Sequence, residues 1–241
     1  MEITHFEKLD STNEYAKRLE FNSDIRRAIV ADSQYKGKGR EKRKFVSDKG
    51  GLYFSIVIDV EFVPDKLSFI TQITAAAIHK ALKELGIDTF IKWPNDIILN
   101  RKKLAGILVE SINRGFRMRI ISGIGINVEN DVQNIEDAAS LKGEGFTVDK
   151  ESLLGEIIKH FLDFYDRLQV NDIDEALSII KQNSYILNKE ILVHKNNDVF
   201  LALAKDISPD GSLIVEYKEG GREAIYSSGV QIRLPREIER E

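Results

Sequence analysis

A glycine-punctuated basic stretch at residues 31–55 holds the side chains that point most directly to chemistry. Between positions 36 and 44, six lysine and arginine residues stand against one acid, Glu41, so the local charge is +5 although the whole chain has a formal net charge of −4. Unbalanced like charges repel one another unless an anion answers them. Glycines at positions 37, 39, 50 and 51 let backbone N–H groups approach a ligand closely. The stretch predicts an anion-binding loop, and the alternative is a solvated surface loop.

A second group of polar residues interrupts an apolar segment at residues 90–110. Pro94 cannot donate a hydrogen bond to a sheet, so the strand that contains it is expected to break there and to display Asn95 and Asp96. Lys103 follows on the next strand, after a short polar turn. This pattern favours a polar site, and its alternative is a β-bulge with a surface ion pair between Asp96 and a lysine.

A helix-start signal lies near the N-terminus. Ser11 is followed three residues later by Glu14, which predicts a capping box at the start of an amphipathic helix. Helix capping would account for Ser11 by itself. A helix N-terminus also presents free N–H groups, so the same position suits a polar ligand headgroup.

The elements that must position these residues follow from periodicity and turn signals. Expected strands are 3–6, 28–31, 51–60, 90–99, 103–110 and 116–128, and expected helices are 67–85, 149–169 and 174–185. Short strands follow at 190–194, 199–206, 212–218 and 223–234, with sharp turns at 208–211 and 219–221. We expect an α+β fold in two domains, a larger one over residues 1–187 and a small C-terminal β-barrel over residues 188–241.

Composition narrows the classes of function. With 241 residues, 42% hydrophobic and 31% charged, the chain can form one large core with a small appendage. The absence of cysteine excludes disulfides, thiolate nucleophiles and cysteine-ligated metals, and four histidines with no ligand spacing argue against a histidine zinc site. The sequence has neither a long apolar run nor a signal peptide, so we expect a cytoplasmic protein without membrane contact.

Five motifs in order together resemble the biotin protein ligases, which join biotin to a lysine of a carrier protein through biotinyl-AMP. They are Asp-Ser-Thr-Asn at 10–13, the basic loop at 34–55, Lys-Trp-Pro-Asn-Asp at 92–96, Lys-Leu-Ala-Gly-Ile at 103–107 and Gly-Ile-Asn at 125–127. The resemblance implies a mixed β-sheet with helices on one face, related to class II synthetases, followed by an SH3-like β-barrel. Only nine residues precede Asp10, so the family's N-terminal winged helix, and with it a DNA partner, is not expected.

The same resemblance implies roles for individual residues. Arg40 is expected to hold the adenylate phosphate and close the loop over it, and Lys103 to bridge the biotin carboxylate and the α-phosphate; these are the two expected catalytic residues. Asp96 is expected to hold Mg²⁺ on the phosphates, because a hard carboxylate oxygen suits that ion. The expected residues for binding biotin and ATP are Ser11, Thr12, Asn13, Gln34, Gly37, Lys38, Gly39, Arg40, Arg43, Phe45, Lys92, Trp93, Asn95, Lys103, Gly106 and Asn127.

Within this set, the hydroxyl and amide side chains of residues 11–13 and 34 are expected around the ureido ring, and Asn95 and Asn127 near the nucleotide. Phe45 and Trp93 are expected as apolar walls, with plain core packing as the alternative. A charged, glycine-rich loop that orders around its ligand would shield the adenylate from water. The sequence departs from the family loop at Lys38, Lys42 and Phe45, where the pattern has arginine, glycine and tryptophan.

The expected partner is a biotin carboxyl carrier protein, and a homodimer is an expectation taken from the family alone. Two other functions compete with biotin ligation. A lipoate or octanoate ligase shares the fold and chemistry, but its loop contains a histidine that this loop lacks. A nucleic-acid-binding module could use the run at 36–44 with Tyr35 and Phe45, but the pI near 5.7 argues against a broad positive face.

Overall fold

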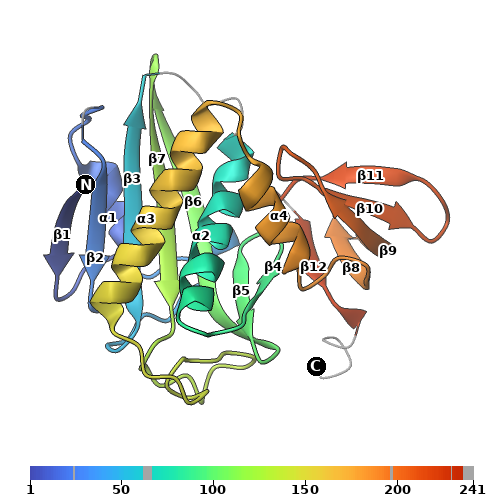
Figure 1. Cartoon of the computed structure of the whole chain (residues 1–241), viewed down its shortest axis with the longest axis horizontal. Helices are drawn as coiled ribbons and strands as arrows, with labels where there is room; N and C mark the ends of the chain where they lie inside the picture. Colours follow the sequence, from blue (N-terminus) through green and yellow to red (C-terminus); the bar gives the residue numbers. More distant parts are fainter. Residues whose placement is uncertain (24, 62–66, 196–197, 229, 236–241) are drawn as a thin grey trace.

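The computed structural model describes residues 1–23, 25–61, 67–195, 198–228 and 230–235. Its larger part is built on a seven-stranded mixed sheet, in which the first two strands are parallel and all other neighbours antiparallel (Figure 1). In spatial order the strands are β1 (Glu2–Phe6), β2 (Arg27–Ala31), β3 (Leu52–Val60), β7 (Arg117–Ile126), β6 (Lys102–Arg114), β5 (Asp96–Leu99) and β4 (Phe90–Lys92).

Helices cover both faces of this sheet. The long helices α2 (Ile70–Glu84) and α3 (Lys150–Gln169) lie on one face, and α1 (Thr12–Arg18) lies on the other (Figure 1). Alternation along the strands supplies both packing surfaces: Phe54 and Ile56 belong to the main core, whereas Val57 packs with Ala16 of α1 in a separate small cluster. The expectation of helices on one face was therefore wrong for α1.

Two helix ends depart from the expected ranges. A 3₁₀ turn, η2 (Leu67–Phe69), precedes α2, and Gly86 ends the helix as predicted, with φ of +76°. Helix α4 (Asp174–Gln182) stops before 185 because Asn183 and Tyr185 exchange backbone hydrogen bonds with Ile91 of β4, at 2.8 Å each.

The segment 90–99 is a hairpin and not the single interrupted strand predicted for it. A cis peptide bond joins Trp93 to Pro94, and the chain reverses there, so that Lys92 pairs with Asp96. Proline indeed breaks the pairing, but the two halves become neighbouring antiparallel strands. The turn consequently lies at one end of the sheet.

The C-terminal part is a five-stranded antiparallel sheet, in the order β11 (Arg222–Ile225), β10 (Leu213–Tyr217), β9 (Asp198–Ile207), β8 (Glu190–Lys195) and β12 (Val230–Arg233). The predicted strand 223–234 is two strands on opposite edges of this sheet. Trp93 joins the two parts, since its Nε1 donates to the Gly211 carbonyl at 2.9 Å. Residues 196, 197, 229 and 236–241 of the predicted small domain lie outside the described residues.

Candidate active site

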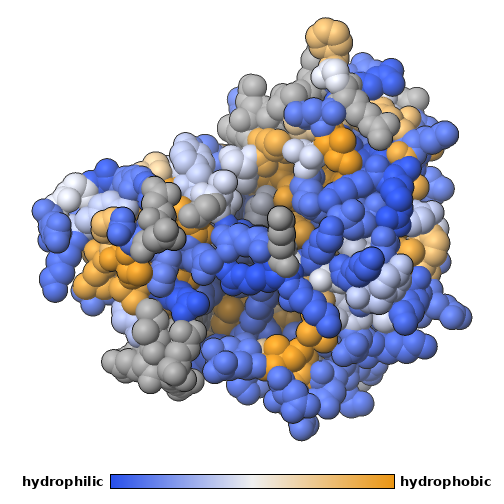
Figure 2. Space-filling model, turned by 180° about the vertical axis from the view of Figure 1, so that it is seen from behind, coloured by the Kyte–Doolittle hydropathy of each residue, from blue (hydrophilic) through white to orange (hydrophobic). Residues whose placement is uncertain are grey.

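The structure brings most of the predicted site residues around one cavity of about 360 Å³. The cavity lies on the α1 side of the sheet, between the basic loop, the hairpin turn at residues 93–95 and strand β12. Figure 2 shows this side, where hydrophilic side chains gather around the recess between the two parts of the molecule. All predicted site residues line the cavity except Gly37 and Asn127.

One end of the cavity is neutral and rich in hydrogen-bonding groups. The Thr12 N–H donates to Gln34 Oε1 at 2.8 Å, and the Ser55 hydroxyl lies 2.7 Å from Thr12 Oγ1 and 2.6 Å from Asn13 Oδ1. Asn13 rests on strand β7 because Gly123 has no side chain, and a Cβ there would lie 2.1 Å from Asn13 Oδ1. These groups form a buried polar wall that can recognise a neutral, hydrogen-bonding ligand group.

The capping box predicted at the start of α1 is absent. Ser11 has extended backbone angles at the N-cap position but makes no side-chain capping bond, and its own N–H donates to the Asp10 carboxylate at 2.8 Å. Arg18 binds the same carboxylate through both terminal nitrogens, and this contact lowers the pKa of Asp10 to about 2. The long-range acceptor Gln34 satisfies the helix N-terminus, which leaves the Ser11 hydroxyl free to line the cavity.

The basic loop folds back on itself as a small hairpin. The N–H of Gly39 donates to the Arg43 carbonyl at 2.8 Å, the N–H of Phe45 donates to the Gly37 carbonyl at 3.0 Å, and the tip is the 3₁₀ turn η1 (Arg40–Lys42). Gly37 does not line the cavity; a Cβ there would lie 2.4 Å from the Phe45 carbonyl oxygen, so glycine serves the close packing of the two arms.

Arg40 brings a positive charge to the cavity and donates hydrogen bonds only to neutral groups among the described residues. Its guanidinium donates to the Val230 carbonyl at 3.3 Å, to the Ser227 carbonyl and to Asn95 Oδ1 at 3.5 Å, all of which are neutral acceptors. Among the described residues, no carboxylate lies within ion-pair distance of it. Burial lowers the pKa of Arg40. A half-buried guanidinium with neutral partners is a favourable place for an anion to bind.

Lys103 lines the cavity, beside Asp96 and above the ring of Phe45. Its Nζ is 2.6 Å from Asp96 Oδ1 and 6.0 Å from the ring centroid. Although this contact is close, Asp96 Oδ1 is buried and makes no hydrogen bond of good geometry with any described residue. Glycines underlie the ring, since a Cβ at Gly125 would lie 2.5 Å from it. Phe45 therefore forms a wall of the cavity.

The turn at residues 93–95 and the end of β4 before it carry three predicted residues to the cavity. Asn95 is fixed to β6 because its Nδ2 donates to the Ile107 carbonyl at 2.7 Å. Trp93 is 2% exposed and is held by Gly211, so it combines core packing with a place at the cavity edge. Lys92 lines the cavity from the end of β4.

Asn127 has a structural role in this arrangement. Its Nδ2 donates to the Ala139 carbonyl at 3.0 Å, and its Oδ1 accepts from Asn130 Nδ2 at 2.9 Å. These bonds fix the segment after β7, which runs beside Lys103, where the Lys103 N–H donates to the Asp137 carbonyl at 2.7 Å. The residue shapes the site from behind and does not face the cavity.

Several lining residues were not predicted. Gly123 and Gly125 lie within the predicted strand 116–128 and were not expected to line a site, while Leu108, Asp137 and the residues of β12 gave no local signal. The register Leu108↔Gly123 and the return of β12 to the cavity are long-range features that local patterns do not encode. The unpredicted lining residues are Lys44, Pro94, Ile107, Leu108, Gly123, Ile124, Gly125, Asp137, Gln231, Ile232 and Arg233.

The lining is strongly positive at the end opposite Thr12. Seven of the lining residues are lysine or arginine and two are aspartate. Lys38 is paired with Glu14, Arg43 with Glu41 and Lys103 with Asp96, whereas Arg40 has neutral partners. The cavity thus joins a neutral hydrogen-bonding end to a basic end that suits phosphate groups.

The chain belongs to the biotin/lipoate A/B protein ligase family, whose model matches residues 5–127. A second model, that of the biotin protein ligase C-terminal domain, matches residues 186–233. The resemblance seen in the sequence motifs is confirmed by these two matches.

Individual proteins agree with this membership. The bifunctional ligase/repressor of Bacillus subtilis is 31% identical over 95% of this chain and 74% of that protein. The biotin–[acetyl-CoA-carboxylase] ligase of Paracoccus denitrificans is 26% identical over 92% of this chain and 97% of that protein. The structure of the biotin protein ligase of Aquifex aeolicus in complex with biotin and ATP superimposes with a TM-score of 0.83 at 27% identity, covering 97% of this chain and 99% of that one. The expected α+β fold is confirmed.

Proposed function

We propose that this chain is an ATP-dependent biotin–protein ligase that forms biotinyl-5′-AMP and transfers biotin to a lysine of a biotin carboxyl carrier protein. The observation that carries the proposal is the cavity itself, in which a neutral polar wall at Thr12, Asn13 and Gln34 continues into a basic end at Arg40 and Lys103. The polar groups of biotin are distributed in the same way, with a neutral ureido ring at one end and a carboxylate at the other.

The first step joins two anions and needs positive charge at their meeting point. A carboxylate oxygen attacks the α-phosphorus of ATP, the new O–P bond forms, and pyrophosphate leaves. Lys103 lines the cavity and would offset the repulsion and the charge that grows on the phosphoryl oxygens. Lys103 now forms one ion pair, with Asp96, and binding of the phosphate group would replace this single contact.

In the second step the adenylate must persist until the carrier lysine arrives. The lysine amine then attacks the biotinyl carbonyl, the amide forms with loss of a proton, and AMP leaves. Arg40 is placed to hold the phosphate of the adenylate, because its guanidinium lines the cavity and has only neutral partners among the described residues. Strand β12 closes the cavity beside it and helps to exclude water.

The residues present fit a magnesium ion bound together with ATP. Asp96 Oδ1 is a buried oxygen without a hydrogen bond of good geometry among the described residues, and Mg²⁺ is commonly held by one or two carboxylates plus phosphate oxygens. Asp96 would hold the ion, which would supply positive charge to offset part of the charge of the phosphate groups.

Three further features belong to the same proposal. A carrier protein is the partner that the reaction requires. The cysteine-free composition supports a reducing, cytoplasmic location, and no helix among the described residues is long and apolar enough to cross a membrane. A homodimer is supported by the unpaired edge of β1, where Ile3 is 54% exposed, and sedimentation velocity would test it.

The family model covers both biotin and lipoate ligases, so the choice between them rests on other observations. The match of residues 186–233 to the biotin protein ligase C-terminal domain and the names of the relatives favour biotin. ATP–pyrophosphate exchange should depend on added biotin and not on lipoate or octanoate. Exchange that responds to lipoate alone would assign the rival ligase, and salt-dependent binding of random DNA or RNA without any exchange would favour the nucleic-acid module.

A further inference from the structure

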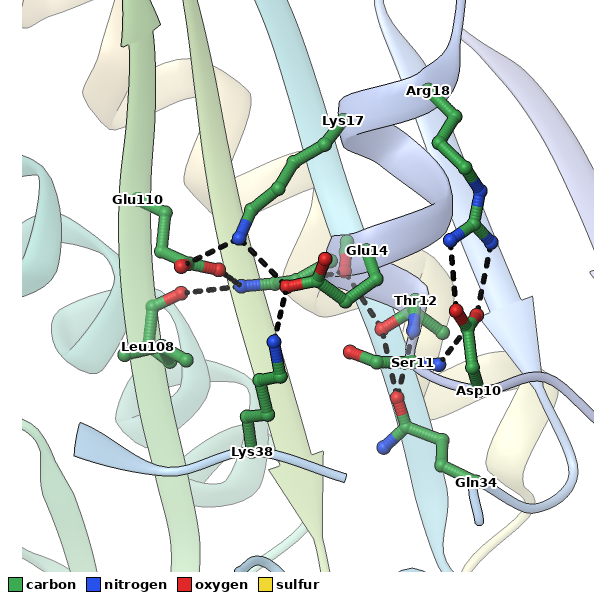
Figure 3. A network of polar contacts seen from close by, with 12 residues as sticks. Asp10, Ser11, Thr12, Glu14, Lys17, Arg18, Gln34, Lys38, Leu108 and Glu110 are labelled. Carbon is green, nitrogen blue, oxygen red and sulfur yellow. Dashed lines mark hydrogen bonds and ion pairs between the residues drawn. The ribbon is translucent and has the colours of Figure 1, made fainter. Parts of the chain in front are cut away.

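An ion-pair chain connects the basic loop to the wall of the cavity. Glu14 Oε1, on α1, accepts from Lys38 Nζ at 2.7 Å and from Lys17 Nζ at 2.8 Å (Figure 3). Lys17 Nζ also binds Glu110 Oε1 at 2.8 Å, and Glu110 Oε2 accepts from Asn13 Nδ2 at 2.8 Å. One continuous set of contacts therefore runs from the loop, across α1, to the polar wall.

The charges within this set of ion pairs are balanced. Two lysines face two glutamates, and hydrogen bonds from Lys17 and Lys38 lower the pKa of Glu14, so its carboxylate is ionised at neutral pH. Lys38 consequently has its charge balanced by a carboxylate of the protein, unlike Arg40, whose hydrogen-bond partners among the described residues are neutral. Within the basic loop, Lys38 therefore anchors the loop to α1, whereas the positive charge of Arg40 is available to bind a ligand.

The position of this anchor divides the loop into a part tied to the α1 side and a part held by other contacts. Before it, the N–H of Tyr35 donates to the Leu9 carbonyl at 3.1 Å, and the N–H of Lys36 donates to the Asp10 carbonyl at 2.9 Å. After it, from Gly39, the loop is held by its own hairpin bonds and by the C-terminal part. Lys38 is thus the last loop residue tied to the α1 side.

This arrangement gives a reason for the lysine at a position where the family loop has arginine. Glu14 offers one oxygen that Lys17 and Lys38 share, and a compact ammonium on a flexible stem suits such a point contact. A guanidinium would instead use two oxygens of one carboxylate in a bidentate geometry, while Lys17 already occupies the shared oxygen.

We propose that Glu14 is a positioning residue for the ligase reaction: it pins Lys38 to α1, fixes the loop at residue 38, which lines the cavity, and makes Gly39 the start of the part of the loop that is not tied to α1. The inference rests on the proposed function only where it is tested by enzyme kinetics. Glu14 does not line the cavity, so it acts on the ligand through the loop.

The test compares Glu14→Gln with a matched control, Glu151→Gln, which removes an exposed carboxylate from the first turn of α3. In the full-length protein, amide exchange of residues 36–38 should become about tenfold faster in Glu14→Gln and stay unchanged in the control. In biotin-dependent pyrophosphate exchange, the KM for biotin should rise about fivefold, while kcat and the KM for ATP stay within about twofold. A merely structural role would lower the melting temperature without this split.

The variant Lys38→Met and the double variant complete the experiment. If the two residues act through one contact, the double variant has the biotin KM of the more affected single variant. Additive effects, or a Glu14→Gln protein with the exchange pattern and biotin KM of the control, would overturn the inference. If wild-type protein shows no biotin-dependent exchange, the proposed function fails, and the amide-exchange comparison still decides the role of Glu14.

Discussion

Replacing Gly123 with alanine should disturb the polar wall in a way that can be calculated from the structure. The new Cβ would lie 2.1 Å from Asn13 Oδ1 and 2.7 Å from its Cγ, closer than atoms approach in proteins. The strand backbone is held in the sheet centre between β3 and β6, so Asn13 is the group that must move. Such a movement separates Asn13 from all of its present partners.

The cost follows from the contacts that Asn13 would lose. Its Nδ2 donates to the Glu110 carboxylate at 2.8 Å and to the Leu108 carbonyl at 3.1 Å, and its Oδ1 lies 2.6 Å from the Ser55 hydroxyl. One charged and two neutral hydrogen bonds together amount to about 3 kcal/mol of unfolding free energy. For a chain of this length, that corresponds to a fall in melting temperature of about 6–12 °C. The KM for biotin should rise at least about tenfold.

The assay is thermal unfolding together with biotin-dependent pyrophosphate exchange. Gly155→Ala is the control, since a Cβ there meets nothing within 4 Å, and an alanine inside α3 should stabilise the helix by about 0.5–1 kcal/mol. Removing the obstructing side chain, as in Asn13→Ala combined with Gly123→Ala, should give a protein no less stable than Asn13→Ala alone. A Gly123→Ala protein with wild-type stability and wild-type KM would refute the described packing of Asn13.

Three other changes have expected outcomes. Asp10→Asn should remove only about 1 kcal/mol of stability at neutral pH, because solvent screens the contact with the exposed Arg18. Since the pKa of Asp10 is lowered to about 2, its contribution in the wild-type protein is present above about pH 4 and is lost toward pH 2. The acid unfolding curves of the two proteins should therefore converge near pH 2. Asp59→Asn should cost about 3–5 kcal/mol in urea denaturation, since it leaves the guanidinium of Arg119 buried without its ion pair of 2.6 Å; a loss below about 1 kcal/mol would contradict this. Chelation of divalent ions should abolish pyrophosphate exchange and leave biotin binding in calorimetry unchanged, and Asp96→Asn should raise the Mg²⁺ concentration needed for half-maximal exchange.

Local patterns predicted the elements well where one residue type determined the outcome. The apolar period of residues 149–169 gave α3, which Asp149 caps by accepting from the Ser152 N–H at 2.8 Å. Gly86 ended α2 as expected, because a left-handed residue favours glycine. The basic loop was located from its charge and its glycines, since such a density of positive charge favours binding of an anion and glycines allow close approach of the backbone.

The misses have a common cause in long-range contacts. The capping box failed because Gln34, far along the chain, accepts from the helix N-terminus, and Glu14 turns to Lys38 instead. Asn127 was placed near the nucleotide, yet Asn130 and the loop behind it use both ends of its side chain. No local sequence pattern predicts which distant group will form a hydrogen bond with a polar side chain.

The second domain illustrates the same limit. Turn signals predicted its strands, but they did not show that β12 would return to the cavity and bring Gln231 and Arg233 to its lining. Nor did they show that Arg40 would donate to the Val230 carbonyl across the junction between the two parts. These contacts depend on how two separately formed sheets pack.

Single-turnover formation of biotinyl-5′-AMP measures whether the basic end of the cavity activates the carboxylate of biotin. Lys103→Ala should slow this step on the order of a hundredfold or more, because it removes the ammonium at the meeting point of two anions. Its neighbour Lys102, exposed and 3.9 Å from Glu144, provides the matched control, and Lys102→Ala should form the adenylate at the wild-type rate. Adenylate formation at the wild-type rate in Lys103→Ala would contradict the account.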